Sequence, residues 1–205
     1  MTATRCLVVL AHPLRQSLSA HLATVVQEEA RAAGWDVTCR DLYADAFDPS
    51  LAAAERAAYY ATPPGTLAAE KAELAGADVL ILVFPTWWSG FPAILKGWFD
   101  RVWAPGTAFD HAPGFGPMRP RLAGLSEVLA ITTQGAPAWV DWLVLHRPLR
   151  RILCRGIVGP CAPKARIGWR ALYQTETADP ARVARFEATI RADLKTIARR
   201  RTCRN

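Results

Sequence analysis

The apolar positions of this sequence fall into short continuous runs separated by longer stretches of helical periodicity. Residues 6–10 (CLVVL) and 78–84 (DVLILVF) are the clearest runs, as expected of parallel strands covered on both faces. Gly34 and Gly76 follow two of the periodic stretches, where a helix C-terminus favours glycine. The strands are predicted at residues 6–10, 36–40, 78–84, 128–133 and 156–163, and the helices at residues 17–33, 67–75, 92–103, 140–153 and 180–200.

Strands and helices in alternation predict a single α/β domain over residues 1–205, built as a parallel sheet with helices on both faces. Ligands of such sheets bind beyond the carboxyl ends of the strands, at the switch point of the topology. The loops after the first, third and fourth predicted strands are therefore the expected site. They span residues 11–19, 85–91 and 132–138.

The first loop leads into a helix start that suits a phosphate group. Unpaired N–H groups and the positive end of the helix dipole favour an anion there, and Arg15, Ser17 and Ser19 add side-chain donors. Neither a G-x-G-x-x-G fingerprint nor a P-loop is present. A helix capped by serine, with His12 as an incidental loop histidine, explains the same residues equally well.

The second loop holds two adjacent tryptophans, Trp87 and Trp88, which cannot both bury against one core. At least one of them is expected to face a ligand or a partner chain, and a flat conjugated ligand suits such rings. Gly90 permits close approach of the backbone. A hydrophobic corner of the core or a dimer interface is the competing interpretation.

The third loop, which includes Thr133, Gln134 and Gly135, again places small residues at the end of a strand. This is a weak indication by itself, because loops that contain glycine are common. His146 lies further along, in a stretch rich in Trp and Leu, where a lone histidine is most often buried and hydrogen-bonded.

Composition narrows the class of protein. The chain has 205 residues, 51% of them hydrophobic, and its longest strongly apolar run, residues 77–88, is shorter than the roughly 20 residues that cross a bilayer. No secretory signal precedes the first strand, so we expect a cytoplasmic protein. Five scattered cysteines without C-x-x-C spacing indicate free thiols, with no disulfide and no metal site.

The net charge of +7 comes mainly from residues 147–170 and from the tail at residues 199–204. Cations in a final helical turn complement the helix dipole, which favours a solvated tail. A positive field also attracts anionic NAD(P)H or acidic surfaces. Nucleic-acid binding is not favoured, because the basic residues are not interleaved with aromatic ones and no recognition motif is present.

Residues 90–102 read G-F-P-A-I-L-K-G-W-F-D-R-V and are preceded by Phe84, Pro85 and Trp88. In this segment, and in residues 11–19, 41–49 and 132–135, the sequence resembles the flavodoxin-like NAD(P)H:quinone oxidoreductases. These include the DT-diaphorases, the bacterial drug-modulator reductases and the ancillary oxidoreductases of glutathione-gated potassium efflux. The resemblance implies a three-layer, flavodoxin-like α/β fold with a five-stranded parallel sheet in the order 2-1-3-4-5.

The same resemblance assigns a bound flavin to the three loops. The flavin phosphate is placed near His12, Arg15, Ser17, Leu18 and Ser19. The isoalloxazine ring is placed near Pro85, Thr86, Trp87, Trp88, Ser89 and Gly90, and its pyrimidine side near Thr132, Thr133, Gln134 and Gly135. His146 falls on the family's catalytic histidine, whereas Val140 stands where the mammalian-type enzymes have its accompanying tyrosine.

The implied activity is two-electron, ping-pong transfer of hydride from NAD(P)H through the flavin to a quinone or a similar flat aromatic acceptor. We expect N–H groups of residues 133–135 to face N1 of the flavin, and His146 to give a proton to the quinone oxygen. The phosphate loop lacks the Thr- and Ser-rich cluster of FMN flavodoxins, which favours FAD, with FMN as the alternative.

The family also implies a homodimer. Residues 103–120 are then an excursion that covers the flavin or the dimer seam, with Phe109, His111 and Phe115 within reach of the substrate or simply packed in the loop. Two other functions fit the same fold. One is reduction of free FMN, azo dyes or nitroaromatic compounds. The other is a flavin-bearing regulatory subunit of a membrane transporter, which the basic tail would contact.

Overall fold

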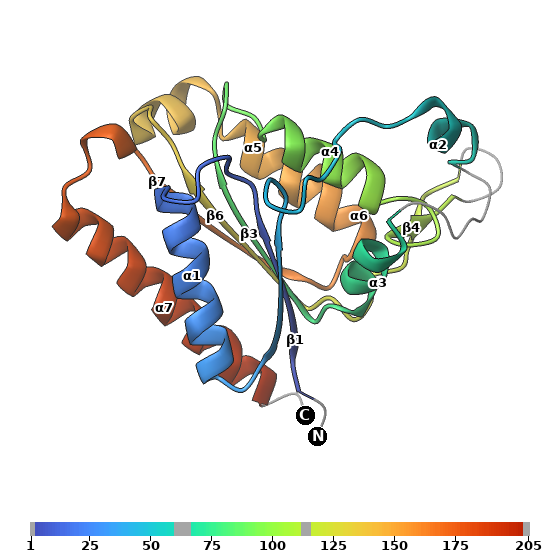
Figure 1. The fold of residues 1–205 in the computed structure, drawn as a ribbon, viewed down its shortest axis with the longest axis horizontal. Coiled ribbons are helices and arrows are strands. Elements are labelled where there is room, and N and C mark those ends of the chain that lie inside the picture. Colours follow the sequence, from blue (N-terminus) through green and yellow to red (C-terminus); the bar gives the residue numbers. More distant parts are fainter. Residues whose placement is uncertain (1–2, 60–66, 112–115, 203–205) are drawn as a thin grey trace.

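The computed structural model describes residues 3–59, 67–111 and 116–202. Five parallel strands form one sheet in the order β2-β1-β3-β6-β7, which confirms the flavodoxin-like order 2-1-3-4-5 (Figure 1). A separate short hairpin pairs β4 with β5. The strands are β1 Arg5–Leu10, β2 Asp36–Asp41, β3 Val79–Pro85, β4 Phe109–Asp110, β5 Arg119–Pro120, β6 Glu127–Thr133 and β7 Arg166–Leu172.

Helices cover both faces of the sheet. α1 and α7 lie on one face, and α3, α4 and the segment from α5 to α6 lie on the other (Figure 1). The α-helices are α1 Leu18–Ala32, α2 Ala53–Ala57, α3 Ala68–Gly76, α4 Ala93–Val102, α5 Pro148–Arg151, α6 Gly159–Cys161 and α7 Pro180–Thr202. Two π-helical segments, η1 Val140–Val144 and η2 Ile152–Val158, and one 3-10 turn, η3 Thr175–Thr177, complete the set among the described residues.

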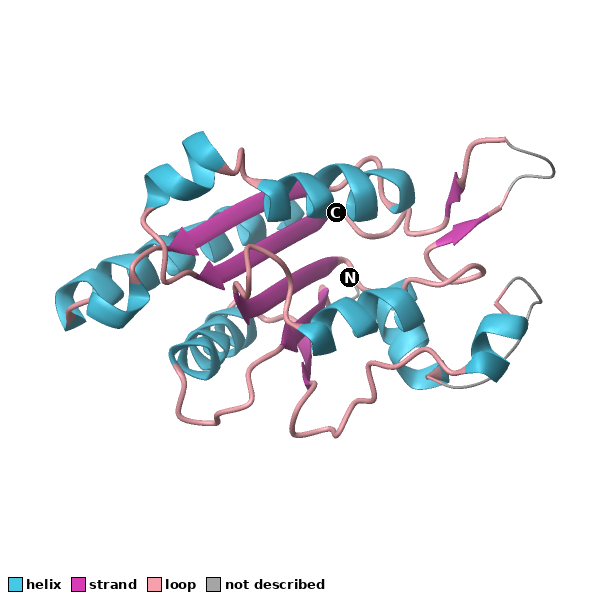
Figure 2. Cartoon of the chain, turned by 90° about the horizontal axis from the view of Figure 1, so that it is seen from above, coloured by secondary structure: helices cyan, strands magenta, loops and turns pink. Residues whose placement is uncertain are grey.

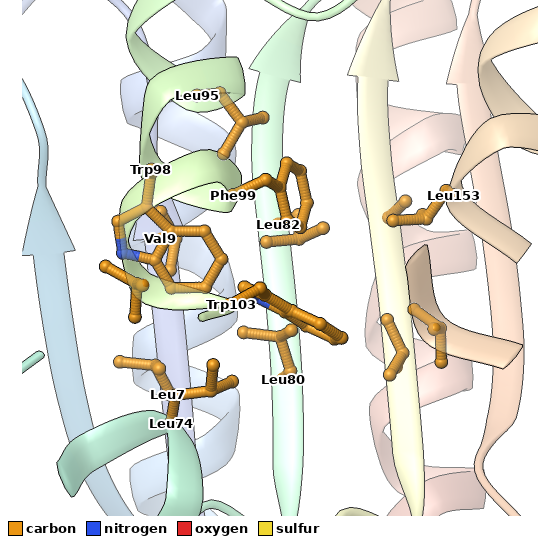
Figure 3. Close-up of a cluster of buried hydrophobic side chains, with 14 of the residues drawn as sticks. Leu7, Val9, Leu74, Leu80, Leu82, Leu95, Trp98, Phe99, Trp103 and Leu153 are labelled. Carbon is orange, nitrogen blue, oxygen red and sulfur yellow. The ribbon is translucent and has the colours of Figure 1, made fainter. Parts of the chain in front are cut away.

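Strand β3 has an uninterrupted apolar sequence because both of its faces are covered. Leu80 and Leu82 pack in the cluster on the α4 side, whereas Ile81 and Val83 pack in the cluster beneath α1 and α7. The α4 side is shown in Figure 3, where Trp98 lies among the leucines of the strands. Burial on both faces is the physical origin of the pattern from which this strand was predicted.

The strand predicted at residues 156–163 is wrong. Residues 156–161 belong to η2 and α6, and the fifth strand of the sheet is β7. Pro160 lies in the first turn of α6, where its missing N–H costs nothing. Strand β7 is at the edge of the sheet, and most of its side chains are only half-buried, so it tolerates Arg166 and Arg170 and lacks a continuous apolar run.

The helix predicted at residues 140–153 is interrupted. After η1 the chain passes through left-handed backbone at His146 and Arg147, with φ of 54° and 55°, and α5 begins only at Pro148. The ring of a proline disfavours helical backbone in the residue before it, so the chain cannot continue through Arg147 as an α-helix. The interruption leaves His146 in a tight turn at the carboxyl edge of the sheet.

The basic tail is not simply a solvated helix end, contrary to the expectation from its charge. Arg201 donates to the Ser126 hydroxyl at 2.8 Å and lies 3.0 Å from a carboxylate oxygen of Asp78. Arg200 lies 3.5 Å from the buried carboxylate of Glu127. Arg204 lies outside the described residues. These contacts fix the end of α7 to the amino edge of β3 and β6, so the cations serve the fold.

Arg201→Ala is expected to lower the free energy of unfolding by about 2 kcal/mol, because it removes a largely buried cation that holds two partners. Arg199→Ala, at an exposed position of the same helix turn, is the control and is expected to change stability by about 0.5 kcal/mol or less. Urea unfolding followed by circular dichroism measures both. Equal losses of unfolding free energy in the two variants would show that the contacts of Arg201 with Ser126 and Asp78 do not stabilise the fold.

The excursion at residues 103–120 contains the β4–β5 hairpin, which projects beyond the helical layer of α3 and α4 (Figure 2). Phe109 packs against the core cluster and its ring centroid lies 5.1 Å from that of His111. Phe115 lies outside the described residues. For Phe109, packing within the excursion is therefore the role that the contacts support.

Candidate functional site

The three predicted loops meet at the carboxyl edge of β1, β3 and β6. Ala11 N–H donates to the carbonyl of Val83 at 3.0 Å, which ties the first loop to β3. Thr86 N–H donates to the carbonyl of Thr133 at 2.8 Å, and the hydroxyls of Thr86 and Thr132 lie 2.8 Å apart. The first, second and third loops therefore form one continuous surface, as expected of a switch point.

Helix α1 begins at this surface, with Ser17 and Leu18 partly exposed and Ser19 buried. Ser17 is its N-cap, in extended backbone, and its hydroxyl accepts from Ala20 N–H at 3.1 Å. The N–H groups of Leu18 and Ser19 precede the first bond of the helical ladder, which runs from His21 N–H to the carbonyl of Ser17. No acidic residue lies in the first turn of α1. The serine cap is therefore present, and the N–H groups that a phosphate would need lie in the same helical turn.

His12 stands at the entry to this loop. Leu14 N–H donates to its Nδ1 at 3.0 Å, so the neutral ring carries its proton on Nε2. Burial lowers the pKa of His12, which keeps the ring neutral at physiological pH. Arg15, in contrast, is exposed, and its side chain is directed by no contact within the described residues.

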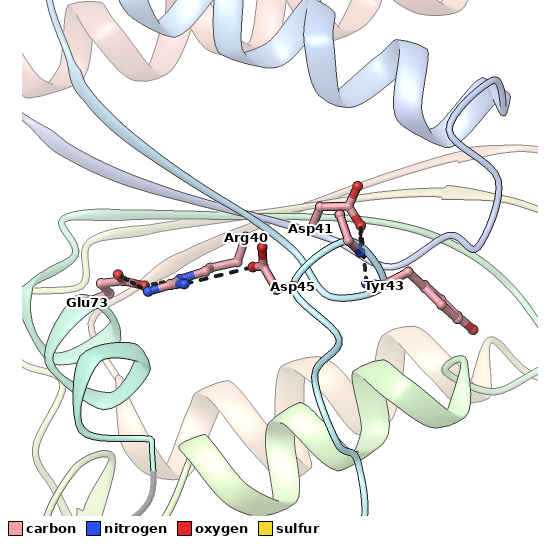
Figure 4. A network of polar contacts seen from close by, with 6 residues as sticks. Arg40, Asp41, Tyr43, Asp45 and Glu73 are labelled. Carbon is pink, nitrogen blue, oxygen red and sulfur yellow. Dashed lines mark hydrogen bonds and ion pairs between the residues drawn. The ribbon is translucent and has the colours of Figure 1, made fainter.

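The segment after β2 borders the same loop. Asp41 accepts from Tyr43 N–H at 3.2 Å and from Ala44 N–H at 3.1 Å, which shapes the turn (Figure 4). Arg40 reaches the other way and makes two hydrogen bonds, of 2.8 and 2.5 Å, to Glu73 of α3. This pairing raises the pKa of Arg40, and the ion pair fixes β2 to the helical layer.

The loop after β3 forms a tight turn that displays indole rings. Trp87 and Gly90 exchange N–H···O=C bonds of 3.1 and 2.8 Å, and the two central residues, Trp88 and Ser89, have φ of 47° and 57°. Such backbone is costly for residues other than glycine, and strain of this kind concentrates at ligand sites. Trp88 is 100% exposed and Trp87 is 56% exposed, so neither ring belongs to the core.

The loop after β6 corrects one expectation about donors. Gln134 N–H donates to the carbonyl of Leu172 at 2.8 Å, so it is not available to face a ligand. Thr133 is paired on both sides, with Pro85 of β3 and Leu172 of β7. Of the three N–H groups expected to face N1 of a flavin, the one at Gly135 remains open to that role, since Gly135 is the exposed residue of the group.

A fourth segment belongs to this surface and was not predicted. Thr175 donates from both its N–H and its hydroxyl to the carbonyl of Gln134, at 3.1 and 3.0 Å, and Gln174 N–H donates to Ala136. The segment follows β7, so placing the fifth strand at residues 156–163 hid it. The alternation of apolar and basic residues in R-I-G-W-R-A-L, followed by Tyr173, is the sequence feature that indicates it.

His146 is exposed rather than buried, unlike most lone histidines in an apolar stretch. It follows η1, whose Trp142 side chain is 52% exposed and donates from Nε1 to the Tyr173 hydroxyl at 2.9 Å. The Arg147 guanidinium lies over the Trp142 ring, 4.9 Å from its centroid. The segment from η1 to α5 therefore joins the loops as a further aromatic part of the site.

These features define a class of protein. The chain is a doubly wound α/β protein whose switch point carries a helix start without acidic residues and exposed indole rings. Residues 4–155 match a family described by its flavodoxin-like fold, and the chain belongs to this family. Within the described ranges, no helix combines the length and apolar character needed to span a membrane.

Relatives and solved structures agree with this assignment. The chain is 33% identical over 173 residues to NAD(P)H dehydrogenase (quinone) 1 of Rattus norvegicus, a match that covers 75% of this chain and 62% of the relative. The protein Smu.1420 of Streptococcus mutans UA159 superposes with a TM-score of 0.80 at 27% identity, covering 93% of this chain and 98% of that one. An NAD(P)H:quinone oxidoreductase from Methanothermobacter marburgensis shares the fold, with a TM-score of 0.82 at 23% identity and coverage of 96% and 98%.

The chain spans about three fifths of the length of the curated mammalian relatives it matches, 60% in Cavia porcellus and 62% in Rattus norvegicus.

Proposed function

We propose that this protein binds a flavin at the carboxyl edge of its sheet and acts as an NAD(P)H dehydrogenase that reduces quinones or similar flat aromatic acceptors. The observation that carries the proposal is that the start of α1, free of acidic residues, and the exposed indoles of Trp87 and Trp88 lie at the same edge of the sheet. A phosphate needs the first feature and a planar ring suits the second. The relatives' names supply the reaction class.

The residues present fit a flavin at each end of its length. Ser17 and the N–H groups of Leu18 and Ser19 would hold the phosphate, with neutral His12 and the cation of Arg15 beside it. The turn at Trp87–Gly90 and the loop at residues 132–135 would hold the ring. The flavin, when bound, supplies the two-electron chemistry between NAD(P)H and the acceptor.

The protein's own part in the reaction is to bind, orient and shield. The indole surfaces of Trp87, Trp88, Trp139 and Trp142 exclude water from one face of a flat molecule, and all four are exposed. Gly135 N–H and the His146 ring are the groups that would steady charge on the ring and on the acceptor oxygen. NAD(P)H and the acceptor would use the same place in turn, in a ping-pong cycle.

Among the flavins we propose FAD, on the ground that residues 11–19 lack the hydroxyl-rich phosphate loop of FMN flavodoxins. We also propose a homodimer, because an apolar surface that includes Trp88 and Trp139 is otherwise left to solvent. The exposed apolar side chains of this surface are Trp87, Trp88, Trp139, Trp142, Leu143, Val144 and Leu145. Light scattering at micromolar concentration tests the second proposal.

The direct experiment is to reconstitute the purified protein with FMN and with FAD, record the visible spectrum, and measure steady-state rates with NADH and NADPH. We expect tight binding of FAD and parallel double-reciprocal lines with menadione as the acceptor. Rates with an azo dye and with free FMN rank the alternative acceptors. A protein that retains neither flavin after gel filtration would overturn the proposal.

A further inference from the structure

Tyr173 connects two segments of the site through its hydroxyl group. The hydroxyl accepts from Trp142 Nε1–H at 2.9 Å and donates to Oδ2 of Asp141 at 2.8 Å. Tyr173 comes directly after β7, whereas Asp141 and Trp142 belong to η1, 32 and 31 residues earlier in the chain, respectively. One hydroxyl thus joins the end of the edge strand to the turn that carries His146.

The carboxylate at the centre of this connection is buried. Asp141 is 6% exposed, and a buried carboxylate is costly unless donors reach it. The Tyr173 hydroxyl supplies a donor, and burial together with Asp141 raises the pKa of Tyr173, so the hydroxyl keeps its proton at physiological pH. A hydroxyl that donates to a carboxylate makes a charge-assisted hydrogen bond, which is shorter and stronger than a neutral one.

The backbone of Asp141 holds the other side of the His146 turn. Arg147 N–H donates to the Asp141 carbonyl at 2.7 Å, and Leu145 N–H donates to the Val140 carbonyl at 2.9 Å. His146 lies between these two closures, in left-handed backbone with φ of 54°. The Arg147 guanidinium over the Trp142 ring adds a further contact across the same turn.

From these contacts we infer that Tyr173 is a positioning residue, whose hydroxyl fixes Asp141 and Trp142 and through them sets the place of the His146 ring at the site. The inference rests on the proposed function, because it gives His146 its use. Tyr173 acts on the acceptor side of the reaction through His146 and Trp142, without itself meeting the reacting atoms. Removal of the hydroxyl alone, in Tyr173→Phe, leaves the ring in place and frees both partners.

Ser126 offers a matched control at the opposite edge of the sheet. Its hydroxyl also donates to one partner, the Asp78 carbonyl at 3.1 Å, and accepts from one partner, Arg201 at 2.8 Å. Tyr173→Phe and Ser126→Ala therefore each remove one hydroxyl with two partners. A purely structural contribution of Tyr173 predicts the same behaviour for both variants.

The first measurement uses the flavin-free protein. The chain has four histidines, so the ring resonances of His146 can be assigned in an NMR spectrum by their loss in His146→Gln. We expect these resonances to shift in Tyr173→Phe and in Asp141→Asn, to shift no further in the double variant, and to stay in place in Ser126→Ala. Unchanged His146 resonances in Tyr173→Phe would overturn the inference, whatever the enzyme's activity.

The second measurement separates the two half-reactions by rapid mixing. In Tyr173→Phe, reoxidation of the reduced protein by menadione is expected to slow by roughly tenfold to a hundredfold, the scale of a misplaced catalytic group, while reduction by NAD(P)H changes by less than about threefold. Equal slowing of both steps would overturn the inference. A wild-type protein that binds flavin but oxidises no NAD(P)H would defeat the proposed function instead, and the NMR result would still decide the role of Tyr173.

Discussion

Gly97→Ala is expected to destabilise the protein by about 3 kcal/mol, because a Cβ at this position would collide with backbone rather than with a flexible side chain. It would lie 2.4 Å from the Cα, the Cβ and the carbonyl oxygen of Pro49. Gly97 is in α4, at the centre of the helical layer, and the segment around Pro49 runs directly across it. The helix and the segment can approach this closely only without a side chain between them.

The crossing segment cannot easily move away. Arg101, one turn further along α4, donates to the Asp48 carbonyl and lies 2.8 Å from the Glu55 carboxylate. Its guanidinium also lies over the Phe47 ring, 5.6 Å from the centroid. Because the Arg101 side chain is only 9% exposed, these contacts resist the shift that an added methyl group demands.

Thermal unfolding measures the effect, and about 3 kcal/mol corresponds to roughly 10 °C in a chain of this size. Gly156→Ala is the matched control, since Gly156 also lies in a helical segment but has nothing within 4 Å of its would-be Cβ. That substitution is expected to stabilise the protein by about 0.5–1 kcal/mol through helix propensity. If Gly97→Ala matched Gly156→Ala, the segment around Pro49 would not pack on α4.

The buried central strands are the part of the fold that the sequence predicts most directly. β1, β3 and β6 are covered on both faces, so their apolar runs mark them within one or two residues. β7 is an edge strand with half-buried side chains, so its sequence gives a weaker strand signal than the apolar sequence of η2. The loops after the buried strands are therefore predicted from the sequence, whereas the segment after β7 is not.

Backbone conformation is the part of the site that the sequence did not indicate. Among the described residues, seven non-glycine residues have positive φ, and five of them lie in the loops after β3, β6 and β7. These five are Trp88, Ser89, His146, Arg147 and Gln174. None of them belongs to an Asn-Gly or Asp-Gly pair, the usual sequence signature of such turns. Hydrogen bonds across the turns hold this backbone conformation instead. Strain of this kind, concentrated at one edge, agrees with a binding role there.

Ser17→Asp is expected to weaken flavin binding about a hundredfold while leaving the folded protein intact. An aspartate is as good an N-cap as serine, so it can still accept from Ala20 N–H. The first turn of α1 has no acidic residue, and a negative charge there interacts favourably with the helix dipole, by about 0.3–1 kcal/mol. The flavin-free variant should therefore be as stable as the wild type or slightly more so.

The same carboxylate opposes a phosphate. At about 5 Å and an effective dielectric constant of about 20, two unit charges repel by about 3 kcal/mol, or roughly a hundredfold in Kd. Ser17→Ala provides the opposite case, because it loses the cap and about 1 kcal/mol of stability but introduces no charge. Ser17→Asp should therefore be the more stable of the two variants, whereas Ser17→Ala should bind the flavin more tightly.

Riboflavin, which lacks the phosphate, isolates the cause. Fluorescence titration of the flavin-free protein should show Ser17→Asp weakening FMN and FAD strongly but riboflavin by less than about threefold, because repulsion requires the phosphate charge. A uniform loss for all three ligands would mean that the substitution disturbs the ring site instead. Undiminished binding of FMN would place the phosphate away from the start of α1 and remove the observation on which the proposed function depends.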